Sequence, residues 1–303
     1  MSADAPTGAG SLAGRDGRAG ARVVRRPVRR RAASPWRVTL YLALGVGALV
    51  MMVPFLYTVS TALKPNAFVF TPEFLPKNAT LQNFADAWNS NNFQRYFLNS
   101  LKVAVLSSLL TVAIATTQAY AFARLSFPGK NLVFNLYLIT MMIPGMLFII
   151  PQFLEARALG LLNTHLGLIV FYVVGSIPFQ TFLLRGFFEN IPRAIEEAAY
   201  VDGAGRFTTF LRVVLPLAGP AVGTSMIFSF LGNWDEFTWA LTIINDVALR
   251  TLPIALRLFQ GQHASQWGLV FAASLIALVP VIIVFVTFQR AFVRGVAAGG
   301  VKG

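Results

Sequence analysis

The sequence predicts an all-α fold, a polytopic membrane bundle of about six transmembrane helices with one long cytoplasmic loop. Hydrophobic residues make up 56% of the 303 residues and charged residues only 12%, whereas about 25% of a soluble domain is charged. The mean hydropathy is +0.64. Apolar stretches of roughly 20 residues, which are long enough to cross a bilayer as helices, recur along the chain.

Six stretches meet this length test, and each is predicted to be one spanning helix. They are Val38–Ala62, Val103–Ala123, Leu132–Phe153, Leu166–Leu184, Val213–Trp234 and Trp267–Phe288. Several contain internal prolines, among them Pro144 and Pro220. Neighbouring helices in a membrane can satisfy the carbonyl groups that proline leaves free, so we expect kinked spans.

Residues 1–36 are predicted to be a disordered cytoplasmic tail, and residues 37–303 the six-span domain. Nine of the 25 basic residues lie between Arg15 and Arg37, in a segment rich in Gly, Ala and Pro without periodicity. The net charge of +13 therefore points to anionic lipid headgroups and not to nucleic acid. The apolar run that follows is too long for a signal peptide, which predicts an uncleaved first span.

The distribution of Lys and Arg predicts the orientation. With the N-terminus inside, the inside segments hold 18 basic residues and the outside segments hold 7. Both termini are thus expected in the cytoplasm.

Several kinds of chemistry have no support in the sequence. The absence of cysteine excludes disulfides, thiol catalysis and cysteine-ligated metals. The two histidines, His165 and His263, fall in predicted outside loops. No G-x-x-x-x-G-K-[ST] motif is present to hold the phosphates of ATP. We expect no catalytic residue, no cofactor and no metal on this chain.

The inside loop 185–212 carries a helix signal. Asn190 is predicted to cap a helix over residues 192–201, with Pro192 in its first turn. Gly203 is the expected stop, because glycine takes a left-handed conformation without steric cost. A second helical stretch is expected from about Gly205 into the fifth span.

Two surfaces could receive this loop helix. It could rest on lipid as an amphipathic helix, or it could dock on a soluble partner. Glu196, Glu197 and Asp202 make it acidic, which anionic lipid repels and a basic socket on a partner would attract. Ala198 and Ala199 give a smooth surface for close approach. The sequence favours a partner.

Glu197-Ala198-Ala199, Gly203 and the sequence Val213-Val-Leu215-Pro216 resemble, in type and spacing, the Glu-Ala-Ala loop of ATP-binding-cassette import permeases. The resemblance implies that residues 185–216, here called the coupling loop, dock on an ATPase subunit. It implies that Glu197 is the docking charge, that Ala198 and Ala199 form the contact surface, and that Gly203 is the bend. Leu215 and Pro216 complete the motif.

Further motifs resemble the maltose-type carbohydrate permeases, in particular the six-span partner of each pair. They are Tyr120–Gly129, Leu159–Thr164, Asn233–Trp239 and Ala298–Gly303. This resemblance implies a heterodimer with a second permease subunit, an ATPase dimer that binds ATP and Mg, and an extracytoplasmic sugar-binding protein. The implied function is import of a di- or oligosaccharide by alternating access, and the implied location is the cytoplasmic (inner) membrane of a bacterium.

Four residues are candidates for contact with the substrate along its path. Asn233, Trp234, Glu236 and Trp239 combine aromatic faces with polar groups, as sugar sites do. The two tryptophans could equally belong to an interfacial aromatic belt. The outside stretch 259–267 resembles the loop that probes the binding protein in this family.

Three alternatives remain open. The same scaffold could import another solute, such as a glycerol phosphate, an amino acid or a phosphonate. An ion-coupled secondary transporter would usually carry ionisable groups at mid-membrane depth, whereas the predicted spans have them only at their ends. A membrane enzyme would need paired acids or an H-E-x-x-H motif, and the sequence has neither.

Overall fold

A computed structural model describes residues 35–65, 69, 73–90, 92–262 and 266–300. Most of the predicted basic tail, part of the stretch 259–267 and the last three residues lie outside the described residues, so the domain boundary near residue 36 stays a prediction. The chain divides into two units, Met1–Met52 and Val53–Gly303.

The first unit contains most of helix α1 (Pro35–Ala62), which ends in the second unit. Large apolar side chains on this part of α1, such as Leu44 and Met51, are exposed. A helix that is apolar on all sides needs lipid or a partner protein to cover it. The helix agrees with the first predicted span.

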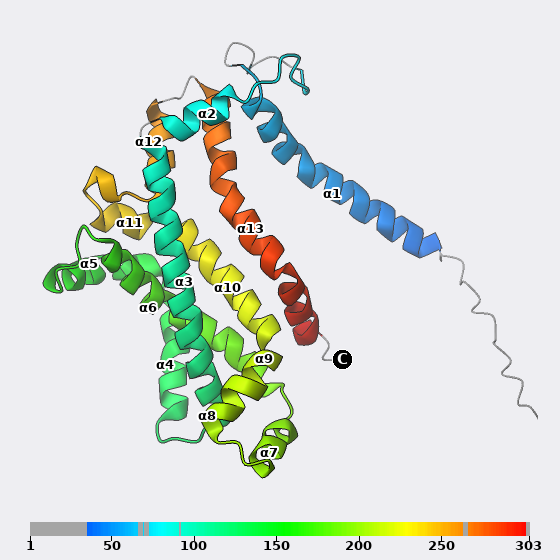
Figure 1. Cartoon of the computed structure of the whole chain (residues 1–303), viewed down its shortest axis with the longest axis vertical. Helices are drawn as coiled ribbons and strands as arrows, with labels where there is room; N and C mark the ends of the chain where they lie inside the picture. The colour runs from blue at the N-terminus through cyan, green and yellow to red at the C-terminus, as the bar shows by residue number, and fades with distance from the viewer. Residues whose placement is uncertain (1–34, 66–68, 70–72, 91, 263–265, 301–303) are drawn as a thin grey trace, which may run out of the picture. The chain divides into compact units, whose positions relative to one another are not determined.

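Helices joined by short loops and turns make up the described residues of the second unit, which contain no strand (Figure 1). Its elements are α2 (Gln82–Asn89), α3 (Phe93–Arg124), α4 (Lys130–Met142), η2 (Gly145–Phe148), α5 (Ile149–Ala158), α6 (His165–Glu189), α7 (Arg193–Val201), α8 (Arg206–Thr209), η3 (Phe210–Val214), α9 (Leu215–Leu217), α10 (Gly219–Trp234), α11 (Thr238–Ile243), η4 (Val247–Leu249), α12 (Leu252–Gln262) and α13 (Trp267–Gly300). The element η3 is a π-helix.

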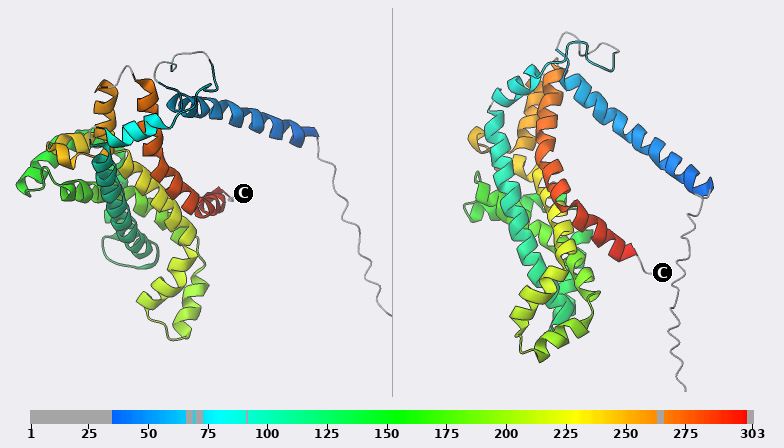
Figure 2. Two further views of the ribbon diagram at one scale, coloured as in Figure 1. Left: turned by 45° about the horizontal axis from the view of Figure 1, so that its top comes forward. Right: turned by 45° about the vertical axis from the view of Figure 1, so that its right-hand side comes forward.

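Helices α3, α6, α10 and α13 form the body of this unit. Helix α3 packs along α6 and α10, and α13 packs along α10 and against α2. Helices α7 and α8 lie at one end and α2 and α12 at the other, in Figure 1 and in both views of Figure 2. We call these the α7 end and the α12 end.

Among the residues that the structure describes, four helices are long and apolar enough to span a membrane, or up to six if each of two bent pairs counts as one span. This confirms the prediction of about six spans. Helices α1, α3, α6 and α13 each include one predicted span and extend past it, α3 by ten residues before Val103.

The third predicted span is not one kinked helix. Helix α4 ends at Met142, and the segment Gly145–Ala158 leaves at an angle of 100°. The cause is Pro144, which lacks an N–H group and disfavours the helical conformation for the residue before it. Ile143 is accordingly extended, with φ −89° and ψ 124°.

The fifth predicted span, Val213–Trp234, is also broken. Arg206–Leu217 and Gly219–Trp234 meet at 75°, and the break lies at Ala218. Pro220 follows in the first turn of α10. Its ring would clash with the carbonyl group of Pro216 in a continuous helix, so α10 starts anew. The coupling loop thus joins the body through a sharp bend.

Candidate functional site

The short helix of the coupling loop forms where the sequence predicts it. Helix α7 spans Arg193–Val201, and Gly203 follows with a φ of +84°. The N–H of Gly203 donates to the carbonyl of Tyr200 at 3.0 Å, and the N–H of Ala204 donates to that of Ala199 at 2.9 Å. These bonds satisfy carbonyl groups at the helix end. The predicted helix stop at a left-handed Gly203 is confirmed.

The predicted cap at Asn190 is wrong. Pro192 occupies the N-cap position of α7, and no side chain accepts a hydrogen bond there. Asn190 instead donates from Nδ2 to the carbonyl of Gly186 at 2.8 Å, within the last turn of α6. The amide group competes for the nearest free helix end, and here that is the C-terminus of α6.

The predicted contact residues lie on the outside of the coupling loop. Glu197 and Ala198 are exposed, and Ala199 is half-buried. Pro216 in α9 is exposed as well, whereas Leu215 packs against the cluster of buried residues at the α7 end. The structure therefore leaves Glu197 and Ala198 accessible to a partner. Their docking role stays a prediction.

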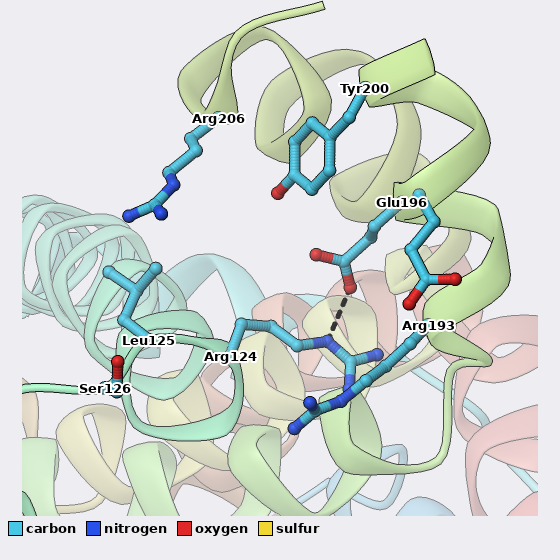
Figure 3. A pocket seen from close by; sticks show the side chains of 8 residues that line it. Arg124, Leu125, Ser126, Arg193, Glu196, Tyr200 and Arg206 are labelled. Atoms are coloured by element: carbon cyan, nitrogen blue, oxygen red, sulfur yellow. Dashed lines mark ion pairs between the residues drawn. The ribbon is translucent and has the colours of Figure 1, made fainter.

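Glu196, which precedes them, points the other way and is the one buried residue of α7. Its carboxylate lies 2.5 Å from Nε of Arg124, the last residue of α3, and the two side chains are only 7% and 6% exposed. The hydroxyl group of Tyr120 donates to the same carboxylate at 3.1 Å. Figure 3 shows the ion pair among the side chains that line a pocket.

This burial corrects the charge argument made from the sequence. Arg124 neutralises the buried Glu196. The exposed charged side chains near α7 are then two acids, Glu197 and Asp202, and two bases, Arg193 and Arg206. The surface is mixed in charge and not acidic. Large apolar side chains also project from it, with Val201 87% exposed and Phe207 73% exposed. Exposed apolar groups of this kind mark a surface that contacts a protein or a membrane.

The pocket beside the ion pair has a volume of about 210 Å³. It is lined by the end of α3 and the two residues after it, and by the coupling loop: Arg124, Leu125, Ser126, Arg193, Glu196, Glu197, Tyr200 and Arg206. The coupling loop therefore meets the membrane body at a polar contact.

The sequence analysis missed Arg124, Glu196 and Tyr120 as a group. Arg124 and Tyr120 are one helical turn apart, which places them on the same face of α3. That spacing was the available signal. Nothing in the sequence showed that this face meets Glu196, which lies 72 positions beyond Arg124.

The proposed substrate-path residues lie toward the other end of α10. Asn233 donates from Nδ2 to Oγ of Ser108 at 3.2 Å and lies 3.4 Å from Oγ of Ser229. Trp234 donates from Nε1 to the carbonyl of Ala277 at 3.2 Å and stacks on Phe230. Both side chains are buried within the chain.

Glu236 fastens the turn between α10 and α11. Its carboxylate accepts the hydroxyl of Tyr172 at 2.7 Å and the N–H groups of Trp239 at 2.8 Å and Ala240 at 3.1 Å. The ring of Trp239 packs against Phe171, with centroids 4.7 Å apart. These contacts give Glu236 a structural task. A contact of the four candidates with substrate stays a prediction.

Among the residues that the structure describes, no group of three or more His, Asp or Glu side chains could hold a metal ion. The expectation that ATP and Mg bind a partner chain stays a prediction.

Comparison with known proteins shows the class. The family described as binding-protein-dependent transport system inner membrane component matches residues 111–298. This is more than half of the chain, so the chain belongs to that family. It is a membrane-embedded permease component of ABC importers, and this confirms the family that the coupling-loop motif indicated.

Three curated relatives have more specific names. The sulfoquinovosyl glycerol transport system permease protein of Agrobacterium fabrum is 39% identical, over 82% of this chain and 88% of the relative. A diacetylchitobiose uptake system permease protein of Streptomyces coelicolor is 35% identical, over 83% and 84%. The trehalose transport system permease protein of Mycobacterium tuberculosis is 33% identical, over 90% and 99%.

Solved structures agree on the fold. A chain of a bacterial ABC transporter involved in the import of the acidic polysaccharide alginate superposes with a TM-score of 0.72 at 25% identity, covering 85% of this chain and 96% of that chain. A chain of a bacterial alginate ABC transporter in complex with an alginate pentasaccharide-bound periplasmic protein gives 0.59 at 18% identity, over 84% and 94%. The second likeness supports the fold alone.

Proposed function

We propose that this chain is one of two different permease subunits of a carbohydrate importer driven by ATP hydrolysis on a separate ATPase dimer. The carbohydrate assignment is supported by the relatives, whose names specify transport of a sulfoquinovosyl glycerol, diacetylchitobiose and trehalose. The substrate class is therefore a di- or oligosaccharide or a glycoside. An extracytoplasmic binding protein delivers it.

The observation that carries the coupling role is the geometry of α7. A short helix stands at one end of the bundle, ends at a left-handed Gly203 and exposes Glu197 and Ala198. Small side chains let a partner backbone approach closely. Val201 and Phe207 add apolar area beside them. We infer that this surface enters a cleft of the ATPase subunit.

The α7 end faces the cytoplasm in this proposal, and both termini lie on the same side. ATP closes the ATPase dimer, α7 moves with its ATPase subunit, and the spanning helices pass from an inward-open to an outward-open state. Hydrolysis resets them. Binding energy that differs between the two states is what allows ATP to shift the equilibrium.

The proposal is tested by purifying the tagged chain from its native membrane in mild detergent and identifying everything retained by mass spectrometry. We expect a second permease and an ATPase at stoichiometric yield. Glu197→Lys, which reverses the predicted docking charge, should retain the second permease and lose most of the ATPase. The chain alone, or a homo-oligomer without an ATPase, would contradict the proposal.

The substrate class needs its own measurement. Cells that carry the wild-type chain or Glu197→Lys are compared for uptake of labelled oligosaccharides, glycerol phosphate and amino acids. We expect the variant to lose uptake of one carbohydrate only. Loss of glycerol phosphate or amino acid uptake instead would leave the importer class standing and refute the carbohydrate assignment.

A further inference from the structure

We propose that α3 transmits the movement of α7 across the membrane, and that Arg124, Glu196 and Tyr120 are positioning residues that fasten α7 to α3. The inference rests on the proposed function, because it concerns how ATP-driven movement of α7 reaches the opposite side. It assigns a role to a buried ion pair that faces α3, on the side of α7 that the exposed Glu197 does not share.

The end of α3 contacts the coupling loop at several points. The Arg124 guanidinium contacts the Glu196 carboxylate at 2.5 Å and donates from Nη2 to the carbonyl of Ile191. It thus holds both the segment that enters α7 and the middle of α7. Two residues of one turn of α3, Arg124 and Tyr120, reach Glu196 together.

Tyr120 also contacts the parts of the chain on either side of α7. Its ring packs edge-on against Phe188 in the last turn of α6, with centroids 5.9 Å apart. It also packs against the ring of Phe210 in the π-helix, with centroids 4.6 Å apart. The elements before and after α7 therefore converge with α7 on a single turn of α3.

The backbone segments that join α7 to α6 and to α10 are less suited to transmitting a displacement of α7. Toward α6, the chain leaves the helix at Asn190 and passes through Pro192 in an extended conformation. Toward α10, it passes through the left-handed Gly203, a π-helix and the 75° break at Ala218. Each of these can absorb a change in backbone angles, as hinge segments do. A displacement of α7 would be lost along both paths.

Helix α3 has no such break. It runs without interruption for 32 residues, which at 1.5 Å per residue is about 48 Å. At its other end, Asn99 donates from Nδ2 to the carbonyls of Ala248 and Arg250, both at 2.9 Å. Oγ of Ser100 accepts the N–H of Leu252 at 2.7 Å. Helix α3 is thus bonded to the segment 248–252, which faces outward in the proposed orientation.

A buried ion pair suits this task. Its charges are shielded from water, so a change in their separation has a larger electrostatic cost than at a surface. Removing one partner leaves the other buried and unpaired. The pair therefore holds α7 in one register on α3, whereas a purely apolar contact could slide.

The test uses the assembled importer in liposomes, with Val247→Cys as a reporter at the α12 end. The chain has no cysteine of its own, and Val247 is 46% exposed. The rate of maleimide labelling is compared without nucleotide and with MgATP and vanadate. The variants are Glu196→Gln and Arg124→Gln. The control is Glu189→Gln, which breaks the exposed ion pair of Arg185 and Glu189 within α6.

We expect both variants to keep the ATPase bound and still hydrolyse ATP. The nucleotide-induced change in labelling should fall about tenfold, within the usual range of coupling between sites, and substrate moved per ATP should fall with it. The control should behave like wild type. Tyr120→Phe, which keeps the ion pair, should lose a smaller part of the change and serves as the second variant if the others assemble poorly.

A full labelling change and normal transport per ATP in Glu196→Gln, or in Tyr120→Phe where only that variant assembles, would overturn the role of α3. Equal losses in the Glu189→Gln control would also overturn it, because the effect would then not be specific to this contact. Failure of the proposed function looks different. A wild-type chain that retains no ATPase refutes it before any variant is compared.

Discussion

The carboxylate of Glu196 in α7 lies 2.5 Å from the guanidinium of Arg124 at the end of α3, and both side chains are almost fully buried. The neighbouring Glu197 is exposed. Adjacent acids on one short helix thus have different surroundings, one facing the bundle and the other the solvent. The coupling loop uses one acid for its own attachment and leaves the next free for a partner.

The first prediction separates these two acids. Glu196→Ala leaves the Arg124 guanidinium buried without its partner, so we expect a loss of about 3–5 kcal/mol in stability and early proteolysis of the coupling loop. Glu197→Ala should change stability by no more than about 0.5 kcal/mol, as exposed substitutions do, while ATPase retention falls. Thermal unfolding in detergent and limited trypsin digestion measure the first effect. Similar melting temperatures for the two variants would contradict the assignment.

The second prediction concerns the bend after α7. Gly203 has a φ of +84° and donates its N–H to Tyr200. Proline fixes φ near −65° and has no N–H group, so Gly203→Pro should still insert into the membrane but no longer support uptake. Gly203→Ala should cost about 1–2 kcal/mol. Gly205→Ala is the control, because its φ is −72° and a Cβ there meets nothing within 4 Å. Normal uptake by Gly203→Pro would refute the need for this bend.

The third prediction tests the packing of α10 on α13. A Cβ at Gly223 would lie 2.6 Å from Cβ of Ala291 and 3.3 Å from the ring of Phe288. Gly223→Ala must therefore push the helices apart, at a cost of about 1–3 kcal/mol. Gly232→Ala on the same helix meets nothing within 4 Å and should be neutral or slightly stabilising. The melting temperatures of the two variants should differ in that order, and equal values would contradict the close approach.

The sequence predicted elements that depend on short-range chemistry. Apolar length predicted the spans, and the glycine after the short helix predicted the left-handed stop at Gly203. Prediction from the sequence failed where two local effects compete. The amide of Asn190 could serve either neighbouring helix end, and it serves α6. Pro144 could kink or break its helix, and the result depends on whether neighbours can satisfy the freed carbonyl groups.

The buried contact between α7 and α3 could not be predicted from the sequence, for a different reason. The spacing of α7 shows that Glu196 and Glu197 are 100° apart on the helix, but not which of them faces the bundle. That depends on how the coupling loop is folded back onto α3, which the breaks at Gly203 and Ala218 determine. Long-range pairs such as Arg124 with Glu196 therefore required the structure.

The last prediction concerns Glu236, a candidate for the substrate path. Its carboxylate receives the Tyr172 hydroxyl and two backbone N–H groups at the start of α11, so its contacts are those of an anchor. If Glu236 anchors α11, Glu236→Gln and Tyr172→Phe should each lower the melting temperature without substrate. The double variant should be little worse than the stronger single one, because residues in contact are not additive. Asp235→Asn, at the exposed neighbour, should have no effect. Unchanged melting of Glu236→Gln together with lost uptake would instead support direct contact with the sugar.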